Sequence, residues 1–200
     1  MKYKVILSDF DGTLVTTDKR LTDYTIQTVR EYVRRGGIFI ICTGRMHVSA
    51  IQYTETLGTQ DQKISVVNMQ GASIIDKDGN SLYSEYLSDE TAIKVLEYFE
   101  EKGEYVHVYD DNSVLIQDYN DINLTYQRLC NVPLKKVGKI SEFVKNSDYK
   151  CIKVLAVIPP EKVDYYLSEF DKMNLKDAKY FMASRTYLET VSIKAGKEEG

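Results

Sequence analysis

The sequence predicts an α/β protein: a mainly parallel sheet flanked by helices, followed by a second, α+β domain. Strand and helix signals alternate in the first part of the chain, which is typical of βαβ units. Around residue 70 the pattern changes to hairpins and separate helices. With 200 residues and 43% hydrophobic content, the chain is long enough for one ordinary domain and a smaller companion.

The elements of the first part follow from short apolar runs, capping residues and glycines. Thr22 is placed to cap a helix that Gly36-Gly37 ends, and Gly58 ends a second helix. The run at residues 5–7 ends in polar residues, and we expect this strand to be buried on both faces. Strands are expected over residues 5–7, 38–42 and 64–68, and helices between residues 22 and 36 and over 46–57.

The second part begins after an expected hairpin over residues 72–83, whose turn contains Asp-Gly. The domains are expected over residues 1–83, 84–188 and 189–200, the last being a return to the first domain. Helices are expected over residues 88–102, 122–130, 140–145 and 161–173, and strands over 104–109, 113–117, 151–158, 179–183 and 187–192.

Composition excludes several classes of function. The formal net charge is −4, from 26 Lys+Arg against 30 Asp+Glu, which argues against a sequence-independent grip on nucleic acid. The longest apolar run, at residues 37–42, is far shorter than the roughly 18 residues that cross a bilayer. Residues 1–4 do not begin a signal peptide. We therefore expect a cytoplasmic protein with no nucleic acid or membrane partner, and its oligomeric state is left open.

The three cysteines are widely spaced and form no C-x-x-C pair. This spacing supports neither a disulfide framework nor a zinc site. We expect Cys42, Cys130 and Cys151 to be buried, reduced thiols.

Two carboxylates, Asp9 and Asp11, follow the first expected strand two residues apart. This places them on one side, at the carboxyl end of a strand, where open α/β sheets bind their ligands. At an effective dielectric near 20, such charges about 4 Å apart repel by roughly 4 kcal/mol. A divalent cation, a shared proton or a basic side chain is therefore needed between them, and hard oxygen donors beside phosphate favour Mg²⁺. Gly12 lets the backbone turn and offer N–H groups to an anion.

The string D-F-D-G-T-L at residues 9–14 resembles the nucleophile motif of the haloacid dehalogenase superfamily of phosphoryl-transfer enzymes. Residues 40–45, ending in Thr-Gly-Arg, resemble its second motif in Cof-type sugar-phosphatase relatives. Residues 68–72 resemble the Asn-Gly-Ala turn of that subgroup, with Met-Gln intruding. Residues 188–198 resemble the return from the cap, where the subgroup places a lysine. The resemblance implies a Rossmann-like core with an inserted C2-type cap.

The resemblance also implies catalytic roles. Asp9 would attack phosphorus and form an aspartyl phosphate, and Asp11 would protonate the leaving oxygen and later activate water. The Asp9 carboxylate and the Asp11 backbone carbonyl would bind Mg²⁺. Thr43 and the Gly44 amide would hold the phosphoryl oxygens. A lysine would neutralise the charge on Asp9 and the phosphate.

Lys197 fits this lysine role best by its distance from residues 188–189, and Lys194 is its rival. Phe10, Gly12 and Thr13 are expected to line the phosphate site. Arg45 either binds substrate or pairs with a nearby carboxylate.

The sequence gives weaker support for placing the two histidines in the active site. His47 is expected at the surface, where a helix begins. His107 shares a strand face with two tyrosines. This face either looks toward the active site or packs on helices of the second domain.

The superfamily's fourth motif, an acidic string after the lysine, does not occur before Gly200. We therefore expect a truncated form with lowered Mg²⁺ affinity and poor activity. The leading hypothesis is a Mg²⁺-dependent phosphatase whose partner is a small phosphorylated metabolite, with sugar phosphates, cofactor phosphates and nucleotides all open. The alternatives are a phosphomutase of the same superfamily and a non-catalytic ligand-binding remnant. A receiver domain does not fit, because its acidic residues belong to separate strands.

Overall fold

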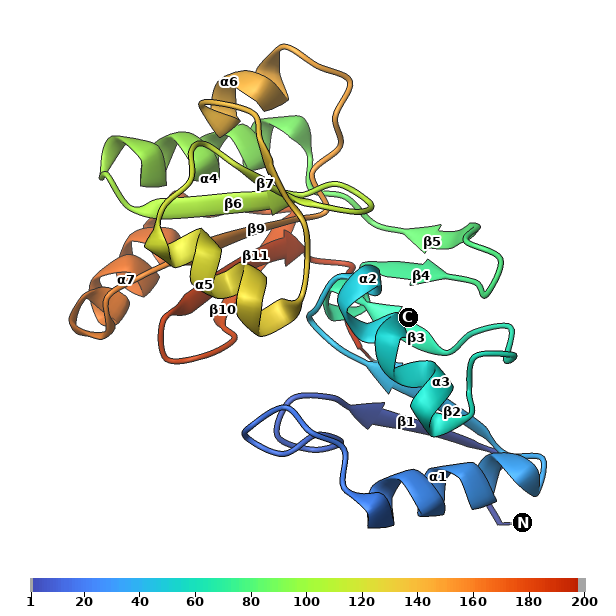
Figure 1. Cartoon of the computed structure of the whole chain (residues 1–200). Coiled ribbons are helices and arrows are strands. Elements are labelled where there is room, and N and C mark those ends of the chain that lie inside the picture. Colours follow the sequence, from blue (N-terminus) through green and yellow to red (C-terminus); the bar gives the residue numbers. More distant parts are fainter. Residues whose placement is uncertain (1, 198–200) are drawn as a thin grey trace. The chain divides into compact units, whose positions relative to one another are not determined.

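The computed structural model describes residues 2–197, which divide into two compact units (Figure 1). Unit 1 extends to Ser84 and takes up the chain again from Gly196, and unit 2 is Glu85–Ala195. The return to the first unit therefore begins at 196 and not at 189 as expected, because strand β11 continues through Ser192 within unit 2. Residues 198–200 of the expected return segment lie outside the described residues.

Unit 1 is built on a five-stranded sheet in the order β1-β2-β3-β4-β5. The neighbours β1, β2 and β3 are parallel, and β3, β4 and β5 are antiparallel. The expected α/β class is therefore confirmed. The strands are β1 (Val5–Asp9), β2 (Ile38–Cys42), β3 (Val66–Asn68), β4 (Ser73–Ile75) and β5 (Ser81–Ser84). The helices are α1 (Asp23–Arg34), α2 (His47–Ala50), η1 (Ile51–Tyr53), α3 (Thr54–Leu57) and η2 (Met69–Gly71).

Helices α1, α2 and α3 contribute to one hydrophobic core with β2 of this sheet. Thr22 caps α1, its hydroxyl oxygen accepting a hydrogen bond from the Thr25 N–H at 3.1 Å. The expected helix over residues 46–57 is instead broken into α2, η1 and α3. The buried side chains of this core include Val29 of α1, Ala50 of α2, Leu57 of α3, and Phe39 and Ile41 of β2.

Strand β1 lies at the edge of the unit 1 sheet and pairs with β2 (Figure 1). The expectation that it is buried on both faces is wrong. Its side chains remain 45% exposed at Val5, 37% at Ile6 and 50% at Leu7. A run of apolar residues predicts a buried strand, but it does not indicate whether other strands flank it on both sides.

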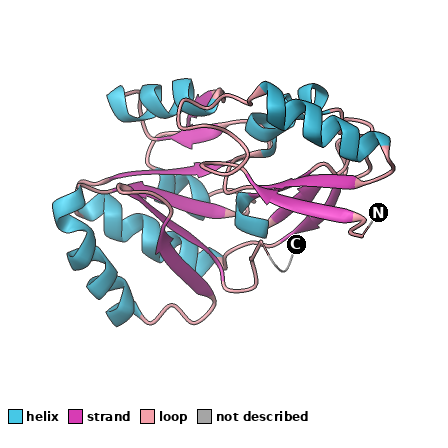
Figure 2. Cartoon of the chain, turned by 90° about the horizontal axis from the view of Figure 1, so that it is seen from below, coloured by secondary structure: helices cyan, strands magenta, loops and turns pink. Residues whose placement is uncertain are grey.

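Unit 2 contains a six-stranded sheet in the order β10-β11-β9-β6-β7-β8, antiparallel except for the β7–β8 pair. The colouring of Figure 2 separates these strands from the helices packed on them. The strands are β6 (Tyr105–Tyr109), β7 (Val114–Ile116), β8 (Leu134–Lys136), β9 (Lys153–Val157), β10 (Ala178–Met182) and β11 (Tyr187–Ser192). The helices are α4 (Asp89–Glu101), α5 (Asp121–Cys130), α6 (Ile140–Lys145), η3 (Pro160–Lys162) and α7 (Val163–Met173).

The two faces of the unit 2 sheet differ in polarity. Helices α4, α6 and α7 cover one face with an apolar core that includes Phe99 and Phe170. The other face carries His107, which is fully buried, lies 2.7 Å from the Tyr109 hydroxyl and packs its ring on Tyr126 of α5. Of the two placements expected for His107, the structure therefore shows the one packed on a helix.

A buried ion pair lies on this polar face. The Lys153 ammonium of β9 donates to the Glu189 carboxylate of β11 at 2.8 Å, and both side chains are buried. The same ammonium lies 4.9 Å from the centre of the Tyr109 ring. These contacts compensate for the desolvation of two charges, which is costly in a protein interior.

The three cysteines are free in the part of the chain that the structure describes. Cys42 and Cys151 are buried as expected, whereas Cys130, also expected to be buried, is partly exposed. Within residues 2–197, every helix is either too short or too polar to cross a bilayer.

We expect Lys153→Met to destabilise unit 2 by about 3–5 kcal/mol, because it leaves the Glu189 carboxylate buried without this cation. Lys150→Met is the control: Lys150 pairs with Asp89 at 2.7 Å, but both side chains are more than half exposed. Its loss changes stability much less. Urea unfolding followed by circular dichroism measures both variants, and equal losses would contradict the role assigned to the buried pair.

Candidate active site

The polar ends of three parallel strands meet at one edge of the unit 1 sheet. Asp9 ends β1, Thr43 directly follows β2, and Asn68 ends β3. The register pairs Asp9 with Cys42, and Cys42 with Val67. Open α/β sheets bind ligands outside the carboxyl ends of their strands, so this edge is the candidate active site.

Lys197 reaches Asp9 from 188 residues away, its ammonium donating to the Asp9 Oδ1. The Thr13 hydroxyl lies 3.4 Å from the other carboxylate oxygen, Oδ2. The rival lysine, Lys194, is exposed and belongs to unit 2. The geometry therefore favours Lys197 as the cation beside Asp9.

Arg45 and Lys19 hold Asp11. The Arg45 guanidinium donates to both carboxylate oxygens, at 2.9 and 2.8 Å, and the Lys19 ammonium donates to Oδ1 at 2.6 Å. Burial raises the pKa of Asp11, but the hydrogen bonds from Arg45 and Lys19 outweigh it and hold the pKa below its ordinary value. Of the two roles open to Arg45, the structure shows the pairing with a carboxylate.

The two acidic side chains are thus neutralised by different cations: Asp9 by Lys197, and Asp11 by Arg45 and Lys19. These basic side chains offset the repulsion expected between the two carboxylates.

Phe10 lies between Asp9 and Asp11 in the sequence and packs in the core beside Arg45. Its side chain is fully buried, and the Arg45 guanidinium lies 4.9 Å from the ring centre. Its carbonyl accepts hydrogen bonds from the N–H groups of Leu14 and Val15, both at 3.1 Å. The Phe10 side chain is therefore part of the core and does not line the phosphate site as expected.

The loops after β1 and β2 offer small residues and backbone groups. Gly12 has φ +79°, a left-handed conformation that favours glycine, and the space beside it is open. Thr43 is buried, and its Oγ1 accepts a hydrogen bond from the Arg45 N–H at 3.1 Å. At Gly44 a Cβ would lie 2.4 Å from the Gln70 side chain. A residue with a side chain does not fit at Gly44 unless Gln70 moves.

Three consecutive residues, Met69, Gln70 and Gly71, have positive φ angles of 51°, 60° and 87°. The Gln70 N–H donates to the Thr43 carbonyl at 3.0 Å, and the Met69 N–H donates to the Arg45 carbonyl at 3.1 Å. Left-handed conformations of non-glycine residues cost energy and cluster at functional sites. The two residues expected to intrude into the turn therefore hold it against the loop after β2.

Gly71 also makes room for the returning chain. A Cβ on Gly71 would lie 2.0 Å from the Gly196 carbonyl oxygen. Lys197, the residue that pairs with Asp9, follows Gly196 directly. The absence of a side chain at Gly71 therefore allows the segment that carries Lys197 to lie close to η2.

His47 differs from its expected position at the surface. It begins α2, is half-buried, and its Nδ1 is buried without a hydrogen-bond partner among the described residues. Burial lowers the pKa of His47. Cys42 lies nearer the acidic site, and burial, with a smaller contribution from Asp9, raises the pKa of its thiol against the opposing effect of Lys197. A thiol in this state is a poor nucleophile.

Sequence reasoning did not single out Lys19 or Ser49. Ser49 lies 3.3 Å from an Arg45 guanidinium nitrogen. Lys19 has a positive φ angle, but this signal is visible only in the structure. The sequence around each residue gives no sign of its contact with the acidic site.

Oxygen donors at this edge suit Mg²⁺ in type and number. The candidate donors are the Asp9 carboxylate and the Asp11 carbonyl. Among residues 2–197, no three His, Cys, Asp or Glu side chains lie together as a metal site. Mg²⁺ commonly takes one or two carboxylates and completes its octahedron with water and substrate phosphate. The donors present therefore fit a magnesium ion that shares its coordination with substrate, and not an all-protein cage.

The fold and this acidic edge define an α/β protein with a candidate ligand site at the carboxyl ends of its parallel strands. The family model described as haloacid dehalogenase-like hydrolase matches residues 6–200. The chain belongs to this family.

Individual relatives match at lower identity. Phosphatase YwpJ of Bacillus subtilis is 27% identical over 111 residues, which cover 56% of this chain and 38% of that protein. A haloacid dehalogenase-like hydrolase from Bacteroides thetaiotaomicron has a similar fold, with TM-score 0.85 and 19% identity over 98% of this chain and 73% of that one. A sugar phosphatase of subclass IIB gives TM-score 0.78 and 17% identity over 98% and 73%. The matches span between 30% and 66% of the length of these curated relatives, and about two fifths in several of them.

We expect Gly71→Ala to destabilise unit 1 more than Gly79→Ala. Both glycines have nearly the same φ, 87° and 86°, so the left-handed strain of about 1–2 kcal/mol is common to both variants. At Gly79 a Cβ meets open space, whereas at Gly71 it meets the Gly196 carbonyl. Urea unfolding measures the difference, and equal stabilities would show that Gly71 does not seat the returning chain.

Proposed function

We propose that this protein is a phosphatase that hydrolyses phosphate monoesters of small metabolites through a phosphorylated Asp9. The observation that carries the proposal is the Asp9 carboxylate at the end of β1, paired with Lys197. A carboxylate with a cation beside it and an acid–base group two residues away is suited to covalent phosphoryl transfer.

In the first half of the reaction, an Asp9 oxygen forms a bond to phosphorus while the bond between phosphorus and the ester oxygen breaks. The leaving oxygen takes a proton from the Asp11 carboxyl, and the alcohol departs. The Lys197 ammonium stabilises the negative charge on Asp9 and on the transferring group.

In the second half, water attacks phosphorus, Asp11 accepts the proton of that water, and the bond from phosphorus to Asp9 breaks. Orthophosphate leaves and the Asp9 carboxylate is restored. Arg45 and Lys19 favour the ionised form of Asp11, which suits this step. The first step needs the protonated form. Displacement of either cation from Asp11 by substrate phosphate would raise the pKa of Asp11 and favour that form.

The phosphoryl oxygens would be held by groups from two loops. The Thr43 side chain and the Gly44 N–H lie after β2, and the Gly12 and Thr13 backbone lies after β1. Backbone N–H groups in a glycine turn form a concave site for an anion.

Magnesium belongs to the proposal as the cofactor, held by the Asp9 carboxylate and the Asp11 backbone carbonyl. When bound, it would draw charge from the phosphoryl oxygens and neutralise the acidic edge. The subclass IIB sugar phosphatase, although it shares only the fold, makes sugar phosphates the first substrates to test.

We expect Asp9→Asn to lower the rate of p-nitrophenyl phosphate hydrolysis by about 10³-fold or more, because the amide cannot form the phosphorylated intermediate. The control is Asp78→Asn, in the exposed hairpin turn of the same unit, which should leave the rate unchanged. The rate is measured by orthophosphate release from sugar phosphates and p-nitrophenyl phosphate, with Mg²⁺ and with chelator.

Full turnover by Asp9→Asn would remove Asp9 from the nucleophile role. An isomeric sugar phosphate without orthophosphate release would indicate a phosphomutase, and ligand binding without turnover in the unmodified protein would indicate a binding protein.

A further inference from the structure

The contact between Gln70 and Gly44 explains why residue 44 has no side chain. The φ angle of Gly44 lies outside the left-handed region, so an alanine could adopt the same backbone conformation. A Cβ at this position would instead lie 2.4 Å from the Gln70 Nε2 and 2.9 Å from its Cδ. The Gln70 carboxamide therefore packs directly on the backbone of Gly44, the residue whose N–H is proposed to hold a phosphoryl oxygen.

The backbone of Gln70 contacts the same loop. Its N–H donates to the Thr43 carbonyl at 3.0 Å. The Thr43 carbonyl and the Gly44 N–H belong to one peptide unit, and in a planar trans peptide these two groups point in opposite directions. The hydrogen bond from Gln70 therefore fixes this peptide with the Gly44 N–H directed away from the Gln70 N–H.

The turn that carries Gln70 is held in an unfavourable backbone conformation. Gln70 has φ 60° and ψ 30°, and Met69 before it is also left-handed, with φ 51°. Non-glycine residues rarely adopt such conformations, which cluster at functional sites. In this conformation the N–H groups of both residues reach carbonyls of the loop after β2, those of Thr43 and Arg45. Because glycine rotates about its backbone more freely than other residues, the turn restrains the most mobile residue of that loop.

We propose that Gln70 is a positioning residue for phosphoryl binding. Its N–H holds the Thr43 carbonyl and its carboxamide covers Gly44, so the peptide between Thr43 and Gly44 is kept from turning over. The Gly44 N–H is thereby oriented before an anion arrives, and binding does not have to order it. This inference rests on the proposed function, because it takes the Gly44 N–H to be a donor to phosphate.

Gln70→Gly separates this role from a merely structural one. Glycine adopts the left-handed conformation without strain, so the variant keeps the turn and its N–H but lacks the carboxamide. We expect stability in urea to be unchanged or higher, and the dissociation constant of orthophosphate to rise about tenfold. Isothermal titration calorimetry with Mg²⁺ present measures this constant. The control is Gln60→Gly, at an exposed position of the same unit, which should leave the constant unchanged.

Gly44→Ala tests the contact itself. In the unmodified protein the new Cβ meets the Gln70 amide, so we expect lower stability in urea and weaker binding of orthophosphate. Combined with Gln70→Gly, the same change should cost much less stability, because the amide is gone.

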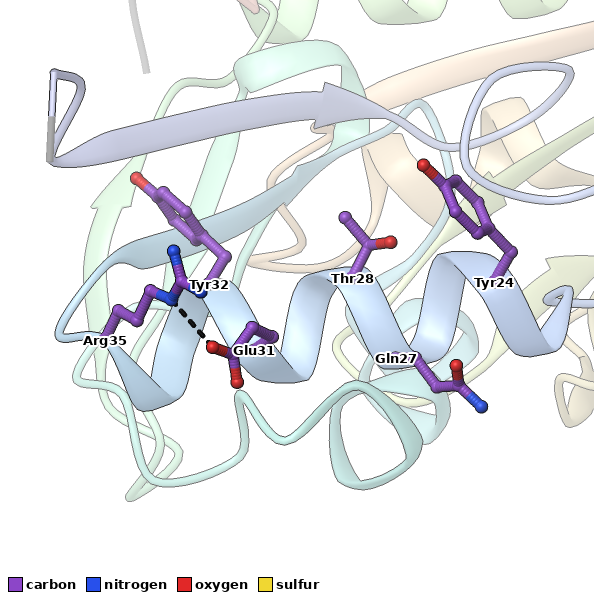
Figure 3. A pocket seen from close by; sticks show the side chains of 6 residues that line it. All are labelled: Tyr24, Gln27, Thr28, Glu31, Tyr32 and Arg35. Atoms are coloured by element: carbon purple, nitrogen blue, oxygen red, sulfur yellow. Dashed lines mark hydrogen bonds and ion pairs between the residues drawn. The ribbon is translucent and has the colours of Figure 1, made fainter.

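Gly37→Ala is the matched control for a glycine that a side chain contacts. Gly37 lies before β2, at the opposite end of that strand from Thr43. Its Cβ would lie 2.3 Å from the ring of Tyr32, which rises from α1 (Figure 3). We expect Gly37→Ala to destabilise unit 1 equally with and without Gln70→Gly, and to leave orthophosphate binding unchanged.

The outcomes distinguish this inference from the proposed function. Equal dissociation constants for Gln70→Gly and the unmodified protein would overturn the inference alone. An equal loss of stability from Gly44→Ala in both backgrounds, or a parallel loss of stability and affinity in Gln70→Gly, would do the same. Failure of the unmodified protein to bind orthophosphate would overturn the proposed function and this inference together.

Discussion

The ion pair between Lys197 and Asp9 is the contact on which the candidate site depends. It joins the end of the first strand to a residue 188 positions later, after the chain has passed through the whole of unit 2. The left-handed turn at Gly71 leaves space for the Gly196 carbonyl and so fixes where the chain returns. The acidic edge is therefore completed by long-range packing and not by β1 alone.

A second constraint is the separate compensation of the two carboxylates. Asp9 is neutralised by Lys197, and Asp11 by Lys19 together with Arg45, which is 9% exposed and packed on Phe10. A planar guanidinium binds both oxygens of a carboxylate and fixes its orientation, which a flexible ammonium does less well. Asp11 is thus held in a defined orientation, whereas Asp9, whose side chain is similarly exposed (42% against 40%), pairs with the more flexible Lys197 ammonium.

The sequence predicted the parts of the fold that depend on local chemistry. The Thr22 cap and the Asp-Gly turn at residues 78–79 determine where a helix and a hairpin form, and the structure places both accordingly. The neighbours of each strand in the sheet could not be predicted. The apolar run of β1, for example, does not indicate that this strand lies at the edge of the unit 1 sheet. The same limit applies to Arg45, whose partner Asp11 is 34 residues away. The return boundary was misplaced because β11 extends beyond the motif residues that suggested it.

The central claim is that Asp9 becomes transiently phosphorylated. The most direct test is to quench the protein in acid during turnover of p-nitrophenyl phosphate, reduce the acyl phosphate with borohydride, and map the peptides by mass spectrometry. The account predicts a reduced side chain at Asp9, with Asp11 unchanged. Steady turnover with every N-terminal peptide unmodified under these conditions, or modification at Asp11 instead, would contradict it.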